Sequence, residues 1–209
     1  MNATVSRKLT LGDIDDIRAY ERVRDSFRAE MIELRHRRRV DIGTIVSLAF
    51  ENRATIKFQI QEMVRAEKIT TDEGVKEELN TYNPLIPELG QLCATLFIEL
   101  TSDESMRGWL PKLVGIEQSV VLRLPDRDQV RCAVDPAHAA QLTRDNITAA
   151  VHYITFELSP EQCAAFGDGT VLAIDHPQYR EETELSAATL GELATDLGDG
   201  RARTTVTQS

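Results

Sequence analysis

The sequence contains few cysteines, few aromatic residues and no long apolar segment. Its three cysteines, Cys93, Cys132 and Cys163, are widely spaced and form no Cys-x-x-Cys pair, which argues against a disulfide framework or a cysteine-based metal site within one chain. Each lies among apolar residues, which predicts a small buried side chain. No run approaches the roughly 18 apolar residues of a transmembrane helix, and residues 1–16 lack the apolar core of a signal peptide. We therefore expect a cytoplasmic protein that does not enter the membrane.

Positive charge is also in deficit. The formal net charge is -10 at pH 7, so nucleic acids and anionic membrane surfaces would repel the chain. The sequence has no Gly-x-Ser-x-Gly elbow, no phosphate-binding loop and no dinucleotide fingerprint, which argues against the common nucleophilic and nucleotide-dependent enzymes. We therefore expect no cofactor, and a role other than catalysis.

The composition is that of an ordinary globular protein, with 209 residues, 42% of them hydrophobic and 28% charged, so the chain can bury its own core. Spacings of three and four predict helices, and alternation predicts strands. The expected helices are 11–38 (one or two helices), about 53–67, 72–80, a short helix after Thr101-Ser102-Asp103 that contains Pro111, one opened by Ser159-Pro160, and 187–197. The expected strands are 40–50 with a break at Gly43, 92–100, 119–124, 130–134, 151–158 and 171–175.

Strands and helices do not alternate strictly along the chain, which favours an α+β fold over a parallel sheet. We expect a mainly antiparallel sheet with N-terminal, central and C-terminal helices. No linker interrupts the pattern, so one domain is predicted over residues 1–197. The segment 198–209 has few apolar residues to bury and is predicted to be a disordered tail.

The segment from Leu48 to Glu67 joins a strand, a short turn and a helix that carry many polar side chains. Asn52 is expected to cap the helix. The candidate binding residues are Glu51, Asn52, Gln59, Gln61, Glu62, Arg65 and Glu67. Arg65 is expected to hydrogen-bond to Gln61 and to pair with a carboxylate such as Glu51 or Glu78. Two interpretations stay open: a site for an anion or a partner protein, or a structural network that joins helix to sheet.

Two histidines are candidate metal ligands. Alternation directs His152 toward the core, and His176 follows the strand 171–175. If these strands are neighbours, the two imidazoles could meet near Glu51, Glu62 or Glu117 and bind zinc, iron or manganese, as in a metal-dependent oxidoreductase or hydrolase. Neither histidine belongs to a Glu-x-x-His or His-x-x-x-His pair, so we favour structural histidines and no bound metal.

The segment Arg35–Arg39 carries four arginines and one histidine. At the end of a helix such cations complement the helix dipole, and we favour a solvated helix end. The alternatives are a docking patch for an acidic partner and, less favoured because no aromatic residue is interleaved, contact with nucleic acid.

Several blocks resemble a bacterial family catalogued only as a domain of unknown function. They are FENRATIKFQIQEMVRAE (50–67), EELNTYNPLIP (77–87), ATLFIEL (94–100), LVGIE (113–117), VHYITFEL (151–158) and DHPQY (175–179), and the resemblance extends from Lys8 to Leu197. Genes of that family commonly neighbour those of rubrerythrin-like proteins and iron–sulfur reductase subunits. The resemblance thus implies a cytosolic accessory protein that binds a redox or peroxide-stress partner. It supplies no catalytic residues, and it leaves the oligomeric state open.

Overall fold

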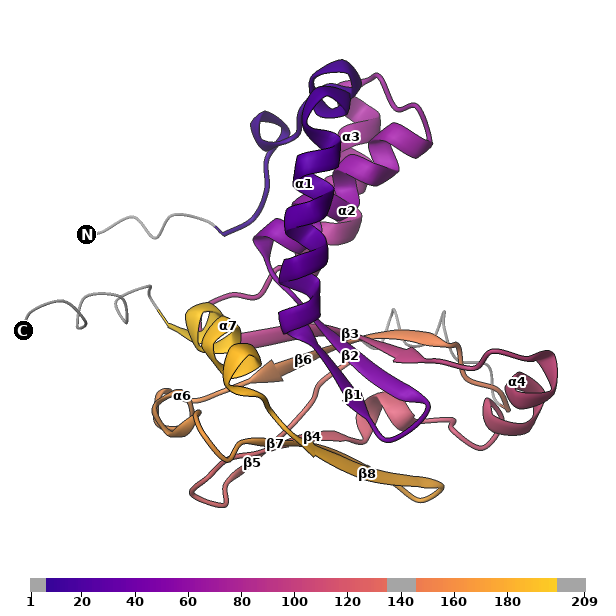
Figure 1. Ribbon diagram of the computed structural model, residues 1–209, viewed down its shortest axis with the longest axis vertical. Helices are drawn as coiled ribbons and strands as arrows, with labels where there is room; N and C mark the ends of the chain where they lie inside the picture. Colours follow the sequence, from indigo (N-terminus) through magenta and orange to yellow (C-terminus); the bar gives the residue numbers. More distant parts are fainter. Residues whose placement is uncertain (1–6, 135–145, 199–209) are drawn as a thin grey trace, which may run out of the picture.

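The computed structural model describes residues 7–134 and 146–198, and its strands form two antiparallel sheets (Figure 1). Sheet A has the order β1-β2-β3-β6 and sheet B the order β5-β4-β7-β8. The bounds are β1 Arg39–Ile42, β2 Val46–Glu51, β3 Gln91–Ile98, β4 Val120–Arg123, β5 Gln129–Arg131, β6 Val151–Glu157, β7 Val171–His176 and β8 Tyr179–Glu184. The α+β class and the antiparallel pairing are confirmed. The strands form two separate sheets, whereas the sequence predicted one. The predicted tail, 198–209, lies outside the described residues except for residue 198.

The main apolar core lies between the two sheets. Sheet A contributes Leu48, Phe50 and Phe156, and sheet B contributes Leu122 and Leu172, all of them fully buried. Because side chains alternate along a strand, the residues between them point away from this core. The outer face of sheet A therefore carries a second set of side chains, which helices cover in part.

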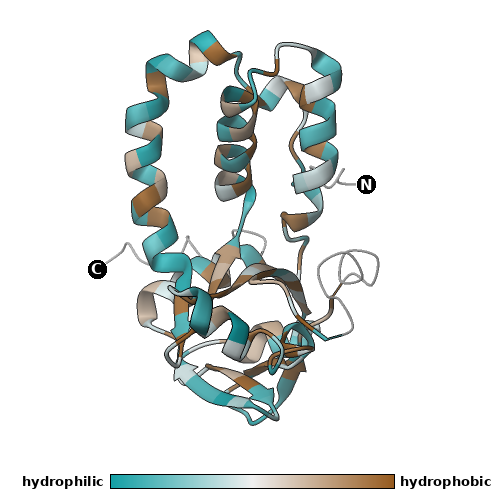
Figure 2. Cartoon of the chain, turned by 90° about the vertical axis from the view of Figure 1, so that its right-hand side faces the viewer, coloured by the Kyte–Doolittle hydropathy of each residue, from teal (hydrophilic) through white to brown (hydrophobic). Residues whose placement is uncertain are grey.

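Three helices form a helical arm that rises from sheet A (Figures 1 and 2). They are α1 (Ile17–Arg38), α2 (Arg53–Ala66) and α3 (Asp72–Tyr82). The arm has its own apolar cluster, made of Leu9, Ile56, Ile60, Val64, Leu79 and Ile86. α1 runs directly into β1 and β2 runs almost directly into α2, so the base of the arm is continuous with the sheet.

Short polar side chains set the helix boundaries as expected, with two exceptions. The Asn52 side chain accepts hydrogen bonds from the first turn of α2 and is its N-cap, as predicted. α1 begins only at Ile17, because Asp16 caps it and residues 11–13 form the separate 3₁₀ turn η1. α4 (Asp103–Trp109) ends before Pro111, so the expected proline within this helix is wrong.

The break expected at Gly43 is a tight turn that separates β1 from β2. Gly43 has φ +69° in the turn of the β1–β2 hairpin, a conformation that glycine adopts readily. The phenol of Tyr179 closes this turn: it donates to the carbonyl of Ile42 (2.7 Å) and accepts from the N–H of Thr44 (3.0 Å). Tyr179 opens β8, a strand missing from the sequence predictions because most of its side chains are exposed and polar.

The short helices α4 and α6 and two 3₁₀ turns complete the connections. α6 (Pro160–Ala165) is capped by Ser159 with proline in its first turn, as predicted. The 3₁₀ turns are η2 (Asn83–Leu85), which leads from the arm toward β3, and η3 (Ile116–Gln118), which precedes β4. Of the helices described, none combines the length and the apolar character that crossing a membrane requires.

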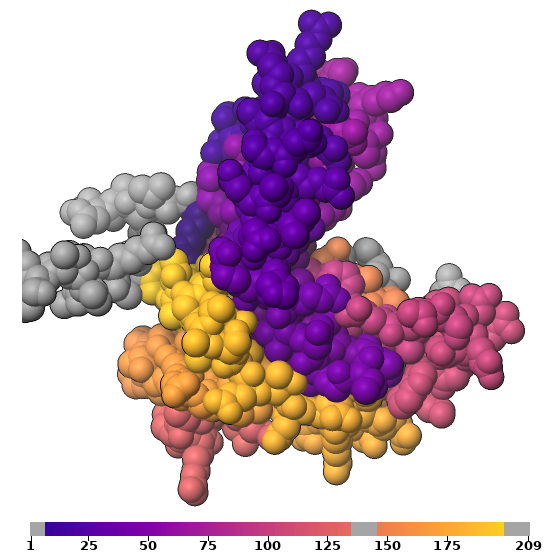
Figure 3. Space-filling view, viewed as in Figure 1, coloured from indigo at the N-terminus to yellow at the C-terminus, as the bar shows by residue number. Residues whose placement is uncertain are grey.

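The C-terminal helix α7 (Ala187–Leu197) packs beside the base of α1 (Figures 1 and 3). Arg38, the last residue of α1, is only 1% exposed and binds across this junction. Its guanidinium donates to the carbonyls of Phe50 (2.9 Å) and Glu51 (3.1 Å), and it pairs with Asp196 of α7. The expectation that the whole run Arg35–Arg39 is solvated is therefore wrong for Arg38, because the fold buries it as the link between α1, β2 and α7.

Candidate functional site

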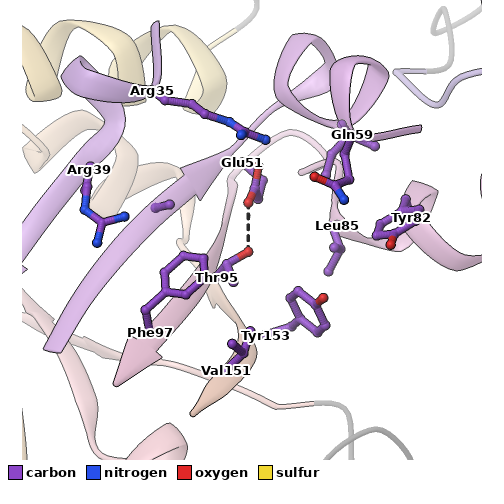
Figure 4. A pocket seen from close by; sticks show the side chains of 12 residues that line it. Arg35, Arg39, Glu51, Gln59, Tyr82, Leu85, Thr95, Phe97, Val151 and Tyr153 are labelled. Atoms are coloured by element: carbon purple, nitrogen blue, oxygen red, sulfur yellow. Dashed lines mark hydrogen bonds between the residues drawn. The ribbon is translucent and has the colours of Figure 1, made fainter. Parts of the chain in front are cut away.

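A pocket of about 270 Å³ lies between the helical arm and the outer face of sheet A; we call it the arm–sheet pocket (Figure 4). Its floor includes Glu51 of β2, Thr95 of β3 and Tyr153 of β6. Its wall includes Arg35 of α1, Arg39 of β1, Gln59 of α2 and Tyr82 of α3. The pocket thus collects side chains from every helix of the arm and from all four strands of sheet A.

Strand alternation explains the floor. Thr95 pairs in register with Ala49 on one side and with Tyr153 on the other, so these three side chains share the outer face. Their neighbours Phe50, Ala94 and Ile154 point into the main core. Glu51 is the last residue of β2, and the turn into α2 starts beside it.

The carboxylate of Glu51 is held by two hydroxyl groups. Thr95 Oγ1 donates to Oε1 (2.8 Å, drawn in Figure 4), and Thr55 Oγ1 donates to Oε2 (2.6 Å). Both threonines are buried. Within the described parts of the chain, no lysine, arginine or histidine forms an ion pair with this carboxylate. Glu51 therefore presents a fixed negative charge and further lone pairs toward the pocket.

The two arginines of the pocket differ in how their charge is balanced. Arg39 pairs with Glu99, which also accepts from Ser47, and its guanidinium lies 5.5 Å from the ring centre of Phe97. Arg35 lies over the ring of Phe58, at 5.2 Å, and among the described residues no carboxylate is within ion-pair distance of it. Arg35 is therefore the cation whose charge is available to a ligand.

Burial raises the pKa of one of the two phenols that line the pocket. The pKa of Tyr153 is raised, first by burial and then by the negative charge that Tyr82 and Glu51 would place near a phenolate. Tyr153 is therefore a neutral phenol at physiological pH. The pocket thus presents one anion, one cation with unbalanced charge, and aromatic surfaces.

Residues 8–197 match the family described as "Protein of unknown function (DUF3501)". The chain belongs to the DUF3501 family. A solved structure that is similar to this DUF3501 protein is a novel protein of unknown function from Burkholderia pseudomallei K96243, with 37% sequence identity and a TM-score of 0.82. The likeness covers 91% of this chain and 100% of the other. No curated protein matches the sequence. The likeness establishes a shared fold, and the family and the solved protein are both of unknown function.

The seven binding candidates of this DUF3501 protein do not form one site. Glu51 and Gln59 line the arm–sheet pocket, whereas Asn52 caps α2 and Glu67 is exposed at the end of that helix. Gln61 is buried, and its amide accepts from the N–H of Asp15 (2.7 Å) and donates to its carbonyl (3.1 Å). It therefore fixes the segment that precedes α1.

Glu62 and Arg65 both lie on α2, and both bind residues of α1. Both oxygens of Glu62 accept from Arg24, at 2.8 and 2.9 Å, and one also accepts from the hydroxyl of Tyr20. The Arg24 guanidinium lowers the pKa of Glu62 to about 2. Arg65 pairs with Glu21 (2.6 Å), so its expected contacts with Gln61 and with Glu51 or Glu78 are wrong. The structural-network interpretation describes this part of α2.

The two histidines lie in different sheets. His152 points into the main core on the face of sheet A opposite Glu51, and its Nε2 lies 2.8 Å from Thr148 Oγ1 and 2.9 Å from the carbonyl of Ala149. His176 Nε2 lies 3.1 Å from the carbonyl of Val114. Residues 7–134 and 146–198 contain no group of three His, Cys, Asp or Glu side chains that could hold a metal ion. The geometry therefore gives no support to the histidine–glutamate metal site, which was the less favoured alternative.

The cysteines behave as buried side chains rather than as nucleophiles. Cys93 and Cys132 are buried, and Cys163 is half-buried. Burial raises the pKa of all three thiols, that of Cys132 to about 11. A thiol with a raised pKa is a weak nucleophile at neutral pH.

A larger cleft of about 570 Å³ lies at the tip of the arm, but caps and backbone contacts already engage its polar groups, such as Asp16 and Thr71.

Sequence reasoning missed much of the pocket. In the sequence, Arg35 belongs to a basic run, and Tyr82, Thr95 and Tyr153 belong to no motif. The available signal was an outward-facing polar or aromatic side chain on an otherwise buried strand, as at Thr95 and Tyr153. Tyr82 carried no such signal, because only the packing of α3 over the sheet brings it to the pocket.

Proposed function

We propose that this DUF3501 protein is a cytosolic accessory protein that binds a ligand rather than transforming one, and that the arm–sheet pocket is its binding site. The observation that supports this proposal is the fixed, half-buried carboxylate of Glu51 facing an aromatic-lined pocket. Such a concave site with a few convergent polar groups is typical of small-molecule binding.

The size of the pocket limits the ligand. Its volume is about 270 Å³. This is near the lower end of ligand pockets, which span roughly 300–1,000 Å³. A small metabolite, or one side chain of a partner protein, fits this volume.

The hydroxyls beside Glu51 support binding over catalysis. Thr55 also accepts from the backbone N–H of Asn52 (2.9 Å), as part of the cap of α2, and Thr95 is buried on β3. A nucleophilic hydroxyl needs a base beside it and access to the substrate. Here both hydroxyls are engaged in orienting the Glu51 carboxylate, and Thr55 lies outside the pocket lining.

A thermal-shift screen tests this proposal. The ligands are small amino acids, carboxylates, amines, sugars and phosphates, and the proteins are the wild type, Glu51→Gln and the matched control Glu67→Gln, whose side chain is exposed at the far end of α2. At least one class should raise the melting temperature of the wild type and of Glu67→Gln, and should raise that of Glu51→Gln less. A screen with no hit, or equal responses in all three proteins, contradicts the proposal.

The partner class rests on the resemblance rather than on the pocket. The resemblance supports a rubrerythrin-like or iron–sulfur protein as the macromolecular partner. Titration calorimetry with a purified protein of each class, against the wild type and against Arg35→Gln, measures this directly. Heat of binding to one of them supports the prediction, and its absence for both contradicts it.

A further inference from the structure

We propose that the occupant of the arm–sheet pocket is a small zwitterion, whose ammonium group binds Glu51 and whose carboxylate binds Arg35. This inference rests on the proposed binding function and specifies the ligand. It follows from the sign, the pairing and the position of the charges that line the pocket.

The charges of the pocket exclude a ligand of one sign. Arg39 is already balanced by Glu99, which leaves Arg35 and Glu51 as the charged side chains whose charge a ligand would meet. They come from α1 and β2, on opposite sides of the joint between arm and sheet. A purely anionic ligand would meet the carboxylate of Glu51, and a purely cationic ligand would meet Arg35. A molecule with both charges satisfies both partners at once.

Glu51 is suited to receive an ammonium group. Each of its oxygens accepts one threonine hydroxyl, and a carboxylate offers about four lone-pair positions, so one position on each oxygen remains. Tyr82 and Tyr153 line the same pocket (Figure 4), and aromatic faces attract cations. The two hydroxyls fix the direction of the carboxylate before the ligand arrives, which reduces the ordering cost of binding.

Arg35 is suited to receive the carboxylate of the ligand. Its guanidinium is restrained by the ring of Phe58 at 5.2 Å, and a planar guanidinium binds a carboxylate through two parallel hydrogen bonds. Arg35 and Glu51 do not form an ion pair with each other. A ligand that reaches from one to the other therefore adds contacts between the arm and sheet A, and it should stabilise the folded protein by mass action.

Titration calorimetry with a matched series tests the assignment. The zwitterions are glycine, β-alanine, 4-aminobutyrate, 5-aminovalerate and 6-aminohexanoate, in which only the charge separation changes. Butyrate, butylamine, glutarate and putrescine supply one charge or two like charges on similar chains. One length of zwitterion should bind best, and its single-charge analogues should bind more weakly by roughly tenfold or more, as expected for the loss of a charged hydrogen bond.

Two variants assign the ends of the ligand. Glu51→Gln should remove the preference for the amino acid over its carboxylate analogue, and Arg35→Gln should remove the preference over the amine. Arg35 is exposed, so its variant should fold even if Glu51→Gln does not. Glu67→Gln is the matched control and should behave as the wild type.

The outcomes separate this inference from the proposed function. If glutarate or butyrate binds as tightly as the best zwitterion, the pocket is an anion site; the inference is then wrong, and the binding function stands. If putrescine or butylamine binds as tightly as the best zwitterion, the pocket is a cation site; the inference is again wrong, and the binding function stands. If only ligands of other classes bind in the thermal-shift screen, the inference fails alone, and if no ligand binds in either experiment, both fail.

Discussion

Replacing Arg38 with alanine should destabilise this protein strongly. The Arg38 side chain is 1% exposed and its partner Asp196 is 11% exposed. The alanine variant leaves that carboxylate buried without its cation, and it removes the donors to the carbonyls of Phe50 and Glu51. Burial already raises the pKa of Asp196, and Arg38 opposes that shift. Without the arginine, the charged form of Asp196 loses its main compensation.

The expected cost is about 3–5 kcal/mol, the usual range for removing one partner of a buried ion pair. For a chain of this length, ~1 kcal/mol corresponds to a change in melting temperature of ~2–4 °C. The Arg38→Ala variant should therefore melt about 6–20 °C below the wild type. Urea denaturation followed by circular dichroism measures the free energy of unfolding. If the slope of that free energy against urea concentration is unchanged, the denatured state is the same in both proteins.

Two further variants check the reasoning. Arg37→Ala is the matched control, since Arg37 is exposed and pairs with Glu192 at the surface; its cost should be about 0–1 kcal/mol. The double variant Arg38→Met with Asp196→Leu removes both charges and should be more stable than Arg38→Ala. If Arg38→Ala unfolds within about 1 kcal/mol of the wild type, Arg38 does not hold α1, β2 and α7 together.

Three more predictions follow from other parts of the structure. The pKa of Glu62 is lowered from 4.5 to about 2, so its contribution to stability is present above pH 4.5 and is lost as the pH falls toward 2. Glu62→Gln should therefore flatten the decline of the unfolding free energy between these pH values. A decline as steep as that of the control Glu67→Gln would count against the Arg24 pairing. Gly43→Ala should cost about 1–3 kcal/mol, because its Cβ would meet Tyr179 and φ is +69°; an unchanged urea midpoint would contradict this. Protein purified without chelator should contain less than one zinc, iron or manganese per chain by mass spectrometry; one metal per chain that is lost on substituting His152 and His176 would restore the enzyme hypothesis.

Much of the local structure could be predicted, because local physics determines it. Asn52 caps α2 with its own side chain, and Ser159 with Pro160 starts α6 in the same way. Alternation predicted the strand that contains Leu48 and Phe50, and it correctly directed His152 into the core. These outcomes depend on neighbours within a few residues, which the sequence displays directly.

The candidate site was less predictable, because helix spacing alone does not say what each face of a helix meets. Gln61, Glu62 and Arg65 were grouped with Glu51 as one set, yet they bind the segment before α1 and α1 itself. Of the seven predicted binding residues, only Glu51 and Gln59 line the arm–sheet pocket. The partners of α2 are supplied by α1, and the sequence contains no record of that packing.

The sequence by itself determined the fold class, most of the helices and strands, and the buried side of some strands, because hydrophobic periodicity and capping act over short distances along the chain. Only the tertiary structure decided that the strands divide into two sheets, that Arg38 is buried, and that Arg35, Glu51 and Tyr153 line one pocket. The physical reason is that these outcomes depend on residues far apart in the chain, which meet only when the helical arm packs over sheet A.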